Sequence, residues 1–222
     1  HNFGKYLIDF FTMTHRVNKD YIKNSVHIAG MEHLNHVLKE GKGGILLSAH
    51  LGNWELAGSV ISLLGYPLSV VALSHRDDKV NTYFNRQREF FGTKVIQTNV
   101  AIRRCLQDLK ANRLIAILGD RDFGHHGIPM SFFGKKALIP KGAALFSIKT
   151  GAPIIPGFFL RADKNKFQFA FQQPIYPPVI KDEKNISEKV LEDYIQQYLH
   201  IMENQIRQNP SQWLMFRRFN IE

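Results

Sequence analysis

A histidine and a glutamate five positions apart could form an acid–base pair at the end of an apolar run. Residues 48–55 read Ser-Ala-His-Leu-Gly-Asn-Trp-Glu and extend the apolar run at 44–49. We expect His50 to leave the end of a buried strand and Glu55 to lie in the first turn of a helix. That turn could fold the carboxylate back toward the imidazole. In open α/β sheets, such strand ends are where ligands bind.

A histidine–carboxylate pair is a workable general base. The carboxylate of Glu55 would hold the imidazole of His50 in one tautomer and stabilise its protonated form. The imidazole could then take a proton from an acceptor hydroxyl as that oxygen attacks an acyl carbon, which is typically worth about 10²–10⁴ in rate. In a structural alternative, Gly52 or Asn53 caps the helix. Glu55 then complements the helix dipole and His50 is a capping or core residue.

Apolar runs alternate with helical patterns along the whole chain. We expect strands at residues 26–29, 44–49, 68–73, 114–118, 153–160 and 166–172. We expect helices at residues 3–17, 31–38, 55–64, 80–91, 101–110, 142–149 and 186–207. This order predicts one α/β domain over residues 1–222, with a central mixed, largely parallel sheet flanked by helices. Helix 3–17 is amphipathic, and it faces either the core or, as the alternative, a membrane surface.

The charge balance indicates an anionic partner. The 222 residues include 29 Lys and Arg against 19 Asp and Glu, a formal net charge of +10. Nucleic acid, an anionic membrane surface, an acidic carrier protein or a phosphorylated substrate would each suit that charge. A hydrophobic fraction of 44% and a charged fraction of 22% indicate a globular chain and exclude a disordered one.

The single cysteine, Cys105, excludes an intramolecular disulfide and fits a reducing compartment. We expect it to be a buried structural residue rather than a catalytic thiol.

No apolar run approaches the roughly 18 to 20 residues that span a bilayer. The chain begins with His1 rather than Met, so we expect a further N-terminal segment in the natural protein. A membrane anchor would have to lie in that segment.

The string at residues 50–55 resembles the signature of the bacterial lipid A biosynthesis acyltransferases, the late acyltransferases. These are related to the wider glycerolipid acyltransferases, which carry an H-x-x-x-x-D/E motif. Further blocks resemble the family in the same order, at residues 88–92, 118–122, 128–134, 142–144, 151–156 and 210–219. The acidic block departs from the family's usual D-Q-D, because Arg121 replaces the glutamine. Family members commonly have a longer N-terminal region, often with a membrane anchor.

The resemblance implies an O-acyltransferase that needs no cofactor. Its donor would be the thioester of acyl carrier protein, with coenzyme A as the alternative carrier. Its acceptor would be a hydroxyl of a lipid A precursor or a similar glycolipid, at the cytoplasmic face of the bacterial inner membrane. A mannosylated inositol lipid or an aminolipid is an alternative acceptor within the same fold.

Several other residues are candidates for substrate binding. Arg88 matches the arginine of the family, and a guanidinium suits a phosphate or a developing oxyanion. Arg76 follows the strand at 68–73 and could contact a phosphorylated acceptor. Asp120 and Asp122 match the acidic block, and Asp120 could orient Arg88 or the acceptor sugar. Asn53 is a further candidate contact. In the structural alternative, the two arginines are solvated charges on a helix or loop. The two aspartates then belong to a turn, and Asn53 caps a helix.

An apolar segment followed by two lysines could touch a membrane. Met130, Phe132 and Phe133 would dip into the lipid while Lys135 and Lys136 meet anionic headgroups. A buried turn explains the same pattern equally well.

Other site types find less support. No clear third ligand joins the histidine pairs at 33 and 36 or at 125 and 126, so we expect no metal. We also expect no nucleic-acid partner, because the basic composition lacks any RNP, zinc-finger or helix-turn-helix pattern. A catalytically inactive membrane scaffold is a third reading, which the His50 and Glu55 pair disfavours.

Overall fold

The computed structural model describes residues 1–122, 124, 127–180 and 186–216. The arginine pair and phenylalanine at 217–219, and the histidines at 125 and 126, lie outside these residues. A seven-stranded sheet runs through the described part of the chain in the order β1-β9-β8-β2-β5-β3-β4. The strands are β1 (Val26–Ala29), β2 (Gly44–Ser48), β3 (Leu68–Ala72), β4 (Lys94–Gln97), β5 (Leu114–Leu118), β8 (Ile154–Asp163) and β9 (Lys166–Phe171).

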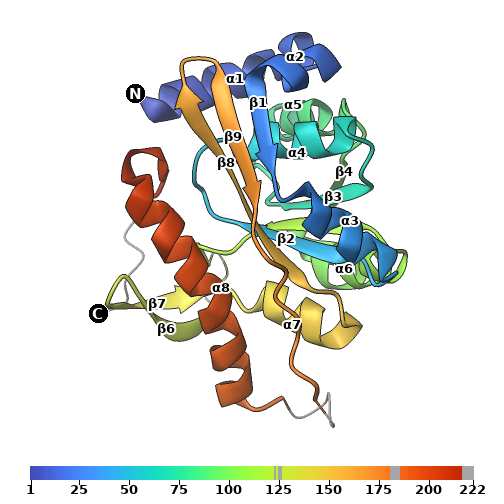
Figure 1. The fold of residues 1–222 in the computed structure, drawn as a ribbon, viewed down its shortest axis with the longest axis vertical. Coiled ribbons are helices and arrows are strands. Elements are labelled where there is room, and N and C mark those ends of the chain that lie inside the picture. The colour runs from blue at the N-terminus through green and yellow to red at the C-terminus, as the bar shows by residue number, and fades with distance from the viewer. Residues whose placement is uncertain (123, 125–126, 181–185, 217–222) are drawn as a thin grey trace.

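All neighbouring strands of this sheet are parallel except β8 and β9, which form an antiparallel hairpin. The chain is therefore a single α/β domain with a mixed, largely parallel sheet, as the sequence predicts (Figure 1). A separate two-stranded hairpin of β6 (Ile128–Phe132) and β7 (Lys135–Ile139) lies beside the last long helix. This hairpin, β4 and the short helix α2 were not predicted from the sequence.

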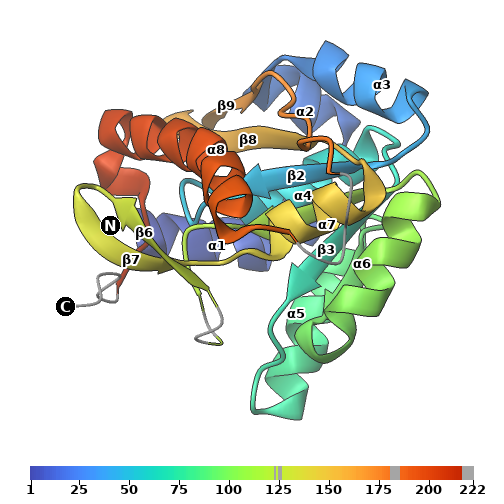
Figure 2. The same cartoon turned by 90° about the horizontal axis from the view of Figure 1, so that it is seen from below.

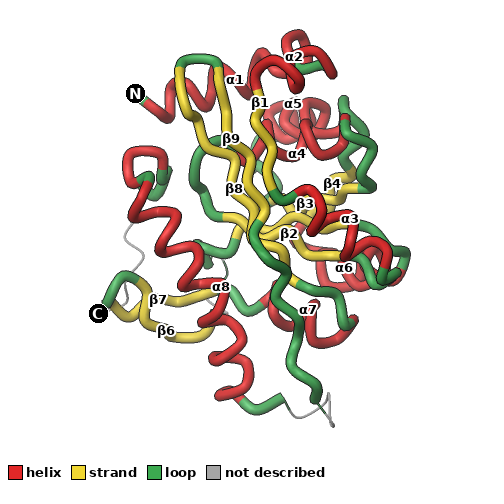
Figure 3. Tube along the Cα trace, in the orientation of Figure 1, coloured by secondary structure: helices red, strands yellow, loops and turns green. Residues whose placement is uncertain are grey.

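Helices cover both faces of the sheet, so the domain has three layers (Figures 2 and 3). The helices are α1 (Asn2–Arg16), α2 (Lys19–Ser25), α3 (Met31–Lys39), α4 (Trp54–Leu63), α5 (Asp78–Glu89), α6 (Ala101–Lys110), α7 (Gly142–Thr150) and α8 (Glu188–Gln208). Short 3₁₀ turns occupy Thr98–Val100 and Pro210–Gln212. Helices α1 to α5 pack on one face, and α6, α7 and α8 pack on the other.

The central strand β2 separates two hydrophobic cores. Side chains alternate along a strand, so Leu46 joins the core under α1 to α4, while Ile45 and Leu47 join the core under α6 to α8. Continuous apolar runs such as β2 suit this arrangement because both faces of a parallel sheet are covered. The apolar runs of the sequence therefore become the strands that carry the candidate site.

Helix α1 faces the core, which was the first of the two expectations for it. Phe10 and Met13 are fully buried in the core under α1 to α4. Asp9 is buried as well and accepts hydrogen bonds from Asn53 and Arg161. These contacts fix α1 against the start of α4. Its outer side nevertheless exposes Phe3, Ile8 and Phe11.

Candidate active site

Two adjacent parallel strands bring His50 and Asp120 together. Ser48 at the end of β2 lies opposite Leu118 at the end of β5. His50 and Asp120 each follow two residues later, so they leave the sheet at the same edge. Nδ1 of His50 lies 2.8 Å from one carboxylate oxygen of Asp120. The backbone N–H of His50 donates to the other oxygen at 3.0 Å.

The carboxylate of Asp120 is buried and held in the ionised form. The indole N–H of Trp213 donates to it at 2.9 Å, and the residue is only 2% exposed. Burial alone would raise the pKa of Asp120, but the hydrogen bonds from His50 and Trp213 and the charge of the imidazole hold it below its usual value. An ionised acceptor at Nδ1 favours the tautomer with the proton on Nδ1, which leaves the lone pair of a neutral imidazole on Nε2.

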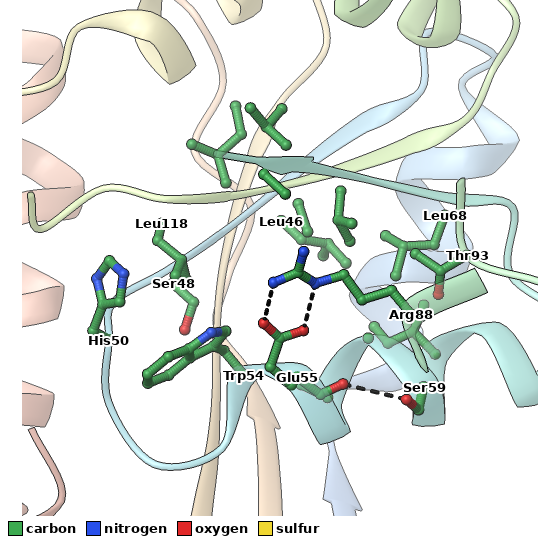
Figure 4. Close-up of a pocket in the computed structure, with 18 of the residues that line it drawn as sticks. Leu46, Ser48, His50, Trp54, Glu55, Ser59, Leu68, Arg88, Thr93 and Leu118 are labelled. Atoms are coloured by element: carbon green, nitrogen blue, oxygen red, sulfur yellow. Dashed lines mark hydrogen bonds and ion pairs between the residues drawn. The ribbon is translucent and has the colours of Figure 1, made fainter. Parts of the chain in front are cut away.

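The carboxylate at Nδ1 of His50 is that of Asp120, which corrects the expectation that Glu55 orients the imidazole. Both oxygens of Glu55 instead accept hydrogen bonds from Arg88, at 2.9 Å from Nε and 2.6 Å from Nη2. The cause is the direction of the first turn of α4, which aims Glu55 at α5. The indole of Trp54 meets the imidazole edge-on at 5.0 Å and lies between His50 and Glu55 in Figure 4.

Arg88 carries the second ion pair of the site, and one nitrogen of its guanidinium has no partner in the described part of the chain. Burial would lower the pKa of its guanidinium, but the two hydrogen bonds with Glu55 outweigh burial and raise the pKa above its usual value. Its third nitrogen, Nη1, is buried and has no hydrogen-bond partner among the described residues. A buried cationic N–H without a partner is costly, so Nη1 is suited to an oxygen of a bound ligand.

His50, Glu55 and Arg88 line one cavity of about 390 Å³. The rest of its lining is mostly apolar, and it lies between the sheet and the helices α1, α4 and α5. The lining includes Leu46, Val70, Ala116 and Leu118 from the strands, and Gly58 and Ile61 from α4. Figure 4 places His50 at one end of the labelled residues and Ser59, Leu68 and Thr93 at the other. A volume of this size suits a small ligand or an acyl chain.

The turn between β2 and α4 depends on Gly52. This residue has φ of +70°, and a side chain there would collide with the backbone carbonyl of Phe159. Asn53 then caps α4, because its side-chain oxygen accepts from the backbone N–H of Leu56 at 3.1 Å. Its amide nitrogen donates to Asp9 at 3.1 Å. Both polar ends of Asn53 are therefore engaged in the fold, and we do not propose it as a substrate contact.

The remaining predicted contacts lie away from the cavity lining. The carboxylate of Asp122 accepts from the backbone N–H groups of Gly124 and Gly127, at 3.1 Å and 2.8 Å, and so shapes its own loop. Arg76 is exposed in the loop before α5, and its contact with a phosphorylated acceptor stays a prediction. The oxygens of Asp120 accept from His50 and Trp213 rather than from Arg88, and its contact with an acceptor sugar stays a prediction.

The predicted membrane-contacting tip is a hairpin whose inner side chains are buried. Met130 and Phe132 are 7% and 0% exposed and belong to the core under α6 to α8. The ring of Phe133 packs against Trp213 at 5.4 Å between centroids. Met130 and Phe132 support the strand pair rather than reach a lipid phase, so the expectation was wrong for these two residues. A lipid contact of half-buried Phe133 stays a prediction. Lys135 and Lys136 are exposed, as a headgroup contact requires.

Cys105 is fully buried, and burial together with Asp108 raises its pKa to about 12. It is a structural residue rather than a nucleophile.

No group of three or more His, Cys, Asp or Glu side chains in the described segments is arranged to hold a metal ion. Among the described helices, none is long and apolar enough to cross a membrane.

A family profile described as bacterial lipid A biosynthesis acyltransferase matches residues 1–220, which is nearly the whole chain. The chain belongs to the bacterial lipid A biosynthesis acyltransferase family. This membership confirms the resemblance seen in the sequence blocks. His50 and Glu55, the two residues singled out in the sequence, line the same cavity.

Curated relatives of this acyltransferase family member come from two groups of bacteria. A phosphatidylinositol mannoside acyltransferase of Mycobacterium tuberculosis is 28% identical over 162 residues, covering 70% of this chain and 51% of the relative. Its counterpart in Mycolicibacterium smegmatis is 29% identical over 133 residues, covering 58% and 44%. A lipid A biosynthesis acyltransferase of Haemophilus influenzae is 24% identical over 186 residues, covering 82% and 57%. The chain spans about half the length of these relatives, which support lipid acyl transfer as the reaction class.

Sequence reasoning missed the partnership of His50 with Asp120 and the part that Trp213 plays in it. One signal was available for Asp120: it follows an apolar run, as His50 does, and the ends of parallel strands meet at one edge of a sheet. Trp213 lies in the family-like block at residues 210–219, but its place in the site depends on the β-bridge that Leu51 and Trp213 form between distant segments.

Proposed function

We propose that this protein transfers a fatty acyl chain from a thioester donor to a hydroxyl of a glycolipid, with His50 as general base. Nε2 of His50 takes the hydroxyl proton while the hydroxyl oxygen attacks the thioester carbon. The tetrahedral intermediate then expels the thiolate, which receives the proton from the imidazolium, and an ester remains on the acceptor. The observation that carries this proposal is the hydrogen bond of His50 with buried Asp120, because His50 also lines a mostly apolar cavity.

In this mechanism Asp120 is a positioning residue for His50. Its carboxylate fixes the tautomer and stabilises the imidazolium that forms when the hydroxyl is deprotonated. Such general-base assistance is typically worth about 10²–10⁴ in rate. Glu55 acts one step further away, because its bidentate ion pair holds the guanidinium of Arg88 against the cavity. Nη1 of Arg88 then donates to an oxygen of the bound substrate.

The cavity accepts the acyl chain. Its walls come from apolar side chains of β2, β3, β5 and α4, and burying apolar surface gives about 25 cal/mol for each Å² removed from water. The donor is the thioester of acyl carrier protein, whose acidity would suit a chain of net charge +10. Coenzyme A is the alternative donor.

The acceptor is a lipid A precursor or a similar glycolipid. A second candidate acceptor is a mannosylated inositol lipid, because the two mycobacterial relatives are named for that activity and are 28% and 29% identical to this chain. Both acceptors present hydroxyls and phosphate beside a lipid, so the same cavity chemistry serves either. An experiment must therefore distinguish between the two acceptors.

We further propose that the enzyme works at the cytoplasmic face of the bacterial inner membrane. Helices α1 and α5 lie against each other and expose Phe3, Ile8 and Phe11 from α1 and Val80 and Tyr83 from α5. The rings of Phe11 and Tyr83 are 5.9 Å apart, so the two helices share an apolar ridge. Apolar side chains of this kind can enter the interface of a lipid leaflet.

Mass spectrometry of lipids tests the proposal. The protein is incubated with acyl-carrier thioesters and, in separate reactions, with a lipid A precursor or a phosphatidylinositol mannoside. We expect one acceptor to gain the mass of a single acyl chain, and we expect His50→Ala to lose this product. Product from neither acceptor with any donor would reject the assignment, and equal product from the His50→Ala variant would reject the assigned base.

A further inference from the structure

Gly58 lies in the middle of α4, where no close neighbour excludes a larger side chain. A Cβ atom at this position would meet a single neighbour within 4 Å, Leu68 Cδ2 at 3.8 Å, which is an ordinary van der Waals distance. Gly52 differs, because a side chain there would collide with the backbone of Phe159. Glycine in the middle of a helix is destabilising relative to alanine. The fold itself therefore gives no reason for the missing side chain of Gly58.

The free space beside Gly58 is part of the cavity. Gly58 lines it together with Trp54 and Ile61, which lie four residues before and three residues after it on the same side of α4. Helix α4 begins at Trp54, beside His50, and runs back along the sheet. At about 1.5 Å per residue, Gly58 lies roughly 6 Å beyond Trp54, and Ile61 lies roughly 4 to 5 Å further.

The end of the cavity away from His50 is lined by buried residues. Leu68 at the start of β3 is 1% exposed, and Thr93 is 4% exposed. The hydroxyl of Thr93 lies 2.7 Å from that of Ser62 on α4, so α4 is tied to the segment before β4 at this point. A chain that enters beside His50 must therefore pass Gly58 before it reaches this end.

We propose that Gly58 sets the length of acyl chain that the protein accepts. The missing side chain keeps the cavity open between the catalytic end at His50 and the end at Leu68 and Thr93. A side chain at position 58 would occupy the space of the distal methylenes while leaving the catalytic end unchanged. This inference rests on the proposed function, because it assigns the cavity to the acyl chain.

The test is a comparison of chain-length preference in the wild type, Gly58→Ala and Gly58→Met. Transfer from decanoyl, myristoyl and palmitoyl donors is measured as kcat/KM for each protein. Each methylene excluded from the cavity costs about fourfold in binding, so three excluded methylenes cost on the order of 60-fold. We expect Gly58→Met to lower the palmitoyl-to-decanoyl ratio by about that factor and Gly58→Ala to lower it by about fourfold. Alanine suits a helix, so the smaller variant remains informative should the methionine disturb folding.

Gly4→Met is the matched control. Gly4 lies in α1, and a side chain there would meet nothing within 4 Å. We expect this variant to keep the wild-type ratio. A palmitoyl-to-decanoyl ratio that stays unchanged in both Gly58 variants, or rates that fall equally for all donors, would overturn the inference.

Direct binding of free fatty acids separates this inference from the proposed reaction. Decanoate and palmitate are titrated by calorimetry, which needs no catalysis. We expect Gly58→Met to weaken palmitate binding by the same order as it lowers the kinetic ratio and to leave decanoate binding within a few-fold. A wild type that binds palmitate but transfers no acyl group would reject the proposed reaction while the Gly58 variants still test the cavity. A wild type that binds neither fatty acid would reject the inference as well.

Discussion

Asp120 holds both the ring and the backbone of His50, through Oδ1 at 2.8 Å from Nδ1 and Oδ2 at 3.0 Å from the amide nitrogen. One carboxylate thus fixes where the histidine leaves β2 and how its imidazole is turned. The indole N–H of Trp213 also donates a hydrogen bond to Oδ2 of Asp120. His50 and Asp120 follow two adjacent parallel strands, β2 and β5. The pair therefore joins distant parts of the chain, unlike a His–Glu pair five residues apart.

Replacing Asp120 by asparagine should impair transfer through the tautomer of His50. An amide can donate a hydrogen bond to Nδ1, which would move the ring proton to Nε2 and remove the base. We expect kcat to fall by about 10²–10⁴. Steady-state kinetics with one donor and one acceptor measure the loss. Asp122→Asn is the matched control, since Asp122 shapes its own loop, and a similar loss in both variants would contradict the role of Asp120.

The ionised state of Asp120 should also appear in the pH dependence of stability. Its pKa in the folded protein lies below the ordinary value of 3.8. The ionised carboxylate therefore stabilises the folded state above about pH 4, and this contribution is lost as pH falls through the folded pKa. We expect the difference in unfolding free energy between wild type and Asp120→Asn to shrink below about pH 4. Urea unfolding at a series of pH values measures it, and a difference that grows on acidification would be inconsistent with the assigned direction.

The ion pair of Glu55 and Arg88 should have separable effects on stability and activity. Arg88→Ala leaves the carboxylate of Glu55 buried without its partner, which typically costs about 3–5 kcal/mol. Removing both charges with Glu55→Gln and Arg88→Gln should recover most of that stability, because no charge remains unpaired. We expect the double variant to stay inactive, since it lacks the donor at Nη1. Thermal unfolding and transfer assays on the same samples check this, and activity that returns with stability would show a purely structural pair.

The buried carboxylate of Asp9 should be important for stability. It pairs with Arg16 at 3.5 Å and with Arg161, and it accepts from Asn53 at 3.1 Å. Asp9→Ala would leave Arg161 without its carboxylate and should cost about 3–5 kcal/mol. Asp193→Ala removes an exposed carboxylate from an i,i+4 pair with Lys189 and should cost about 1 kcal/mol or less. Chemical denaturation compares the two, and equal losses would contradict a special role for Asp9.

Much of the fold could be predicted from the sequence because apolar runs bounded by turn residues become buried parallel strands. Strands β2, β3 and β5 and helix α6 lie close to their expected ranges. The β6–β7 hairpin was missed because its apolar residues and the two lysines after them were interpreted as a membrane-contacting tip or a buried turn. Strand β4 has only four residues, and so short a segment carries little periodicity of its own.

The candidate site could be predicted only in part because it depends on strand register. His50, Glu55 and Arg88 were identified from residue types and blocks, and all three line the cavity. The exchange of partners, His50 with Asp120 and Glu55 with Arg88, arises from tertiary packing that spacing along the chain does not encode. Local spacing favoured Glu55 for His50, whereas the alignment of β2 with β5 supplies Asp120 from 70 residues away.

The most direct test of the account is the rate of acyl transfer by His50→Ala relative to wild type, measured as product formed from a carrier thioester and a glycolipid acceptor. Circular dichroism and thermal unfolding establish that both proteins are folded. Because His50→Ala lacks the proton acceptor, we expect its rate of acyl transfer to fall by about 10²–10⁴. A folded His50→Ala protein that transfers acyl chains within about threefold of the wild-type rate would contradict the assignment of His50 as the base.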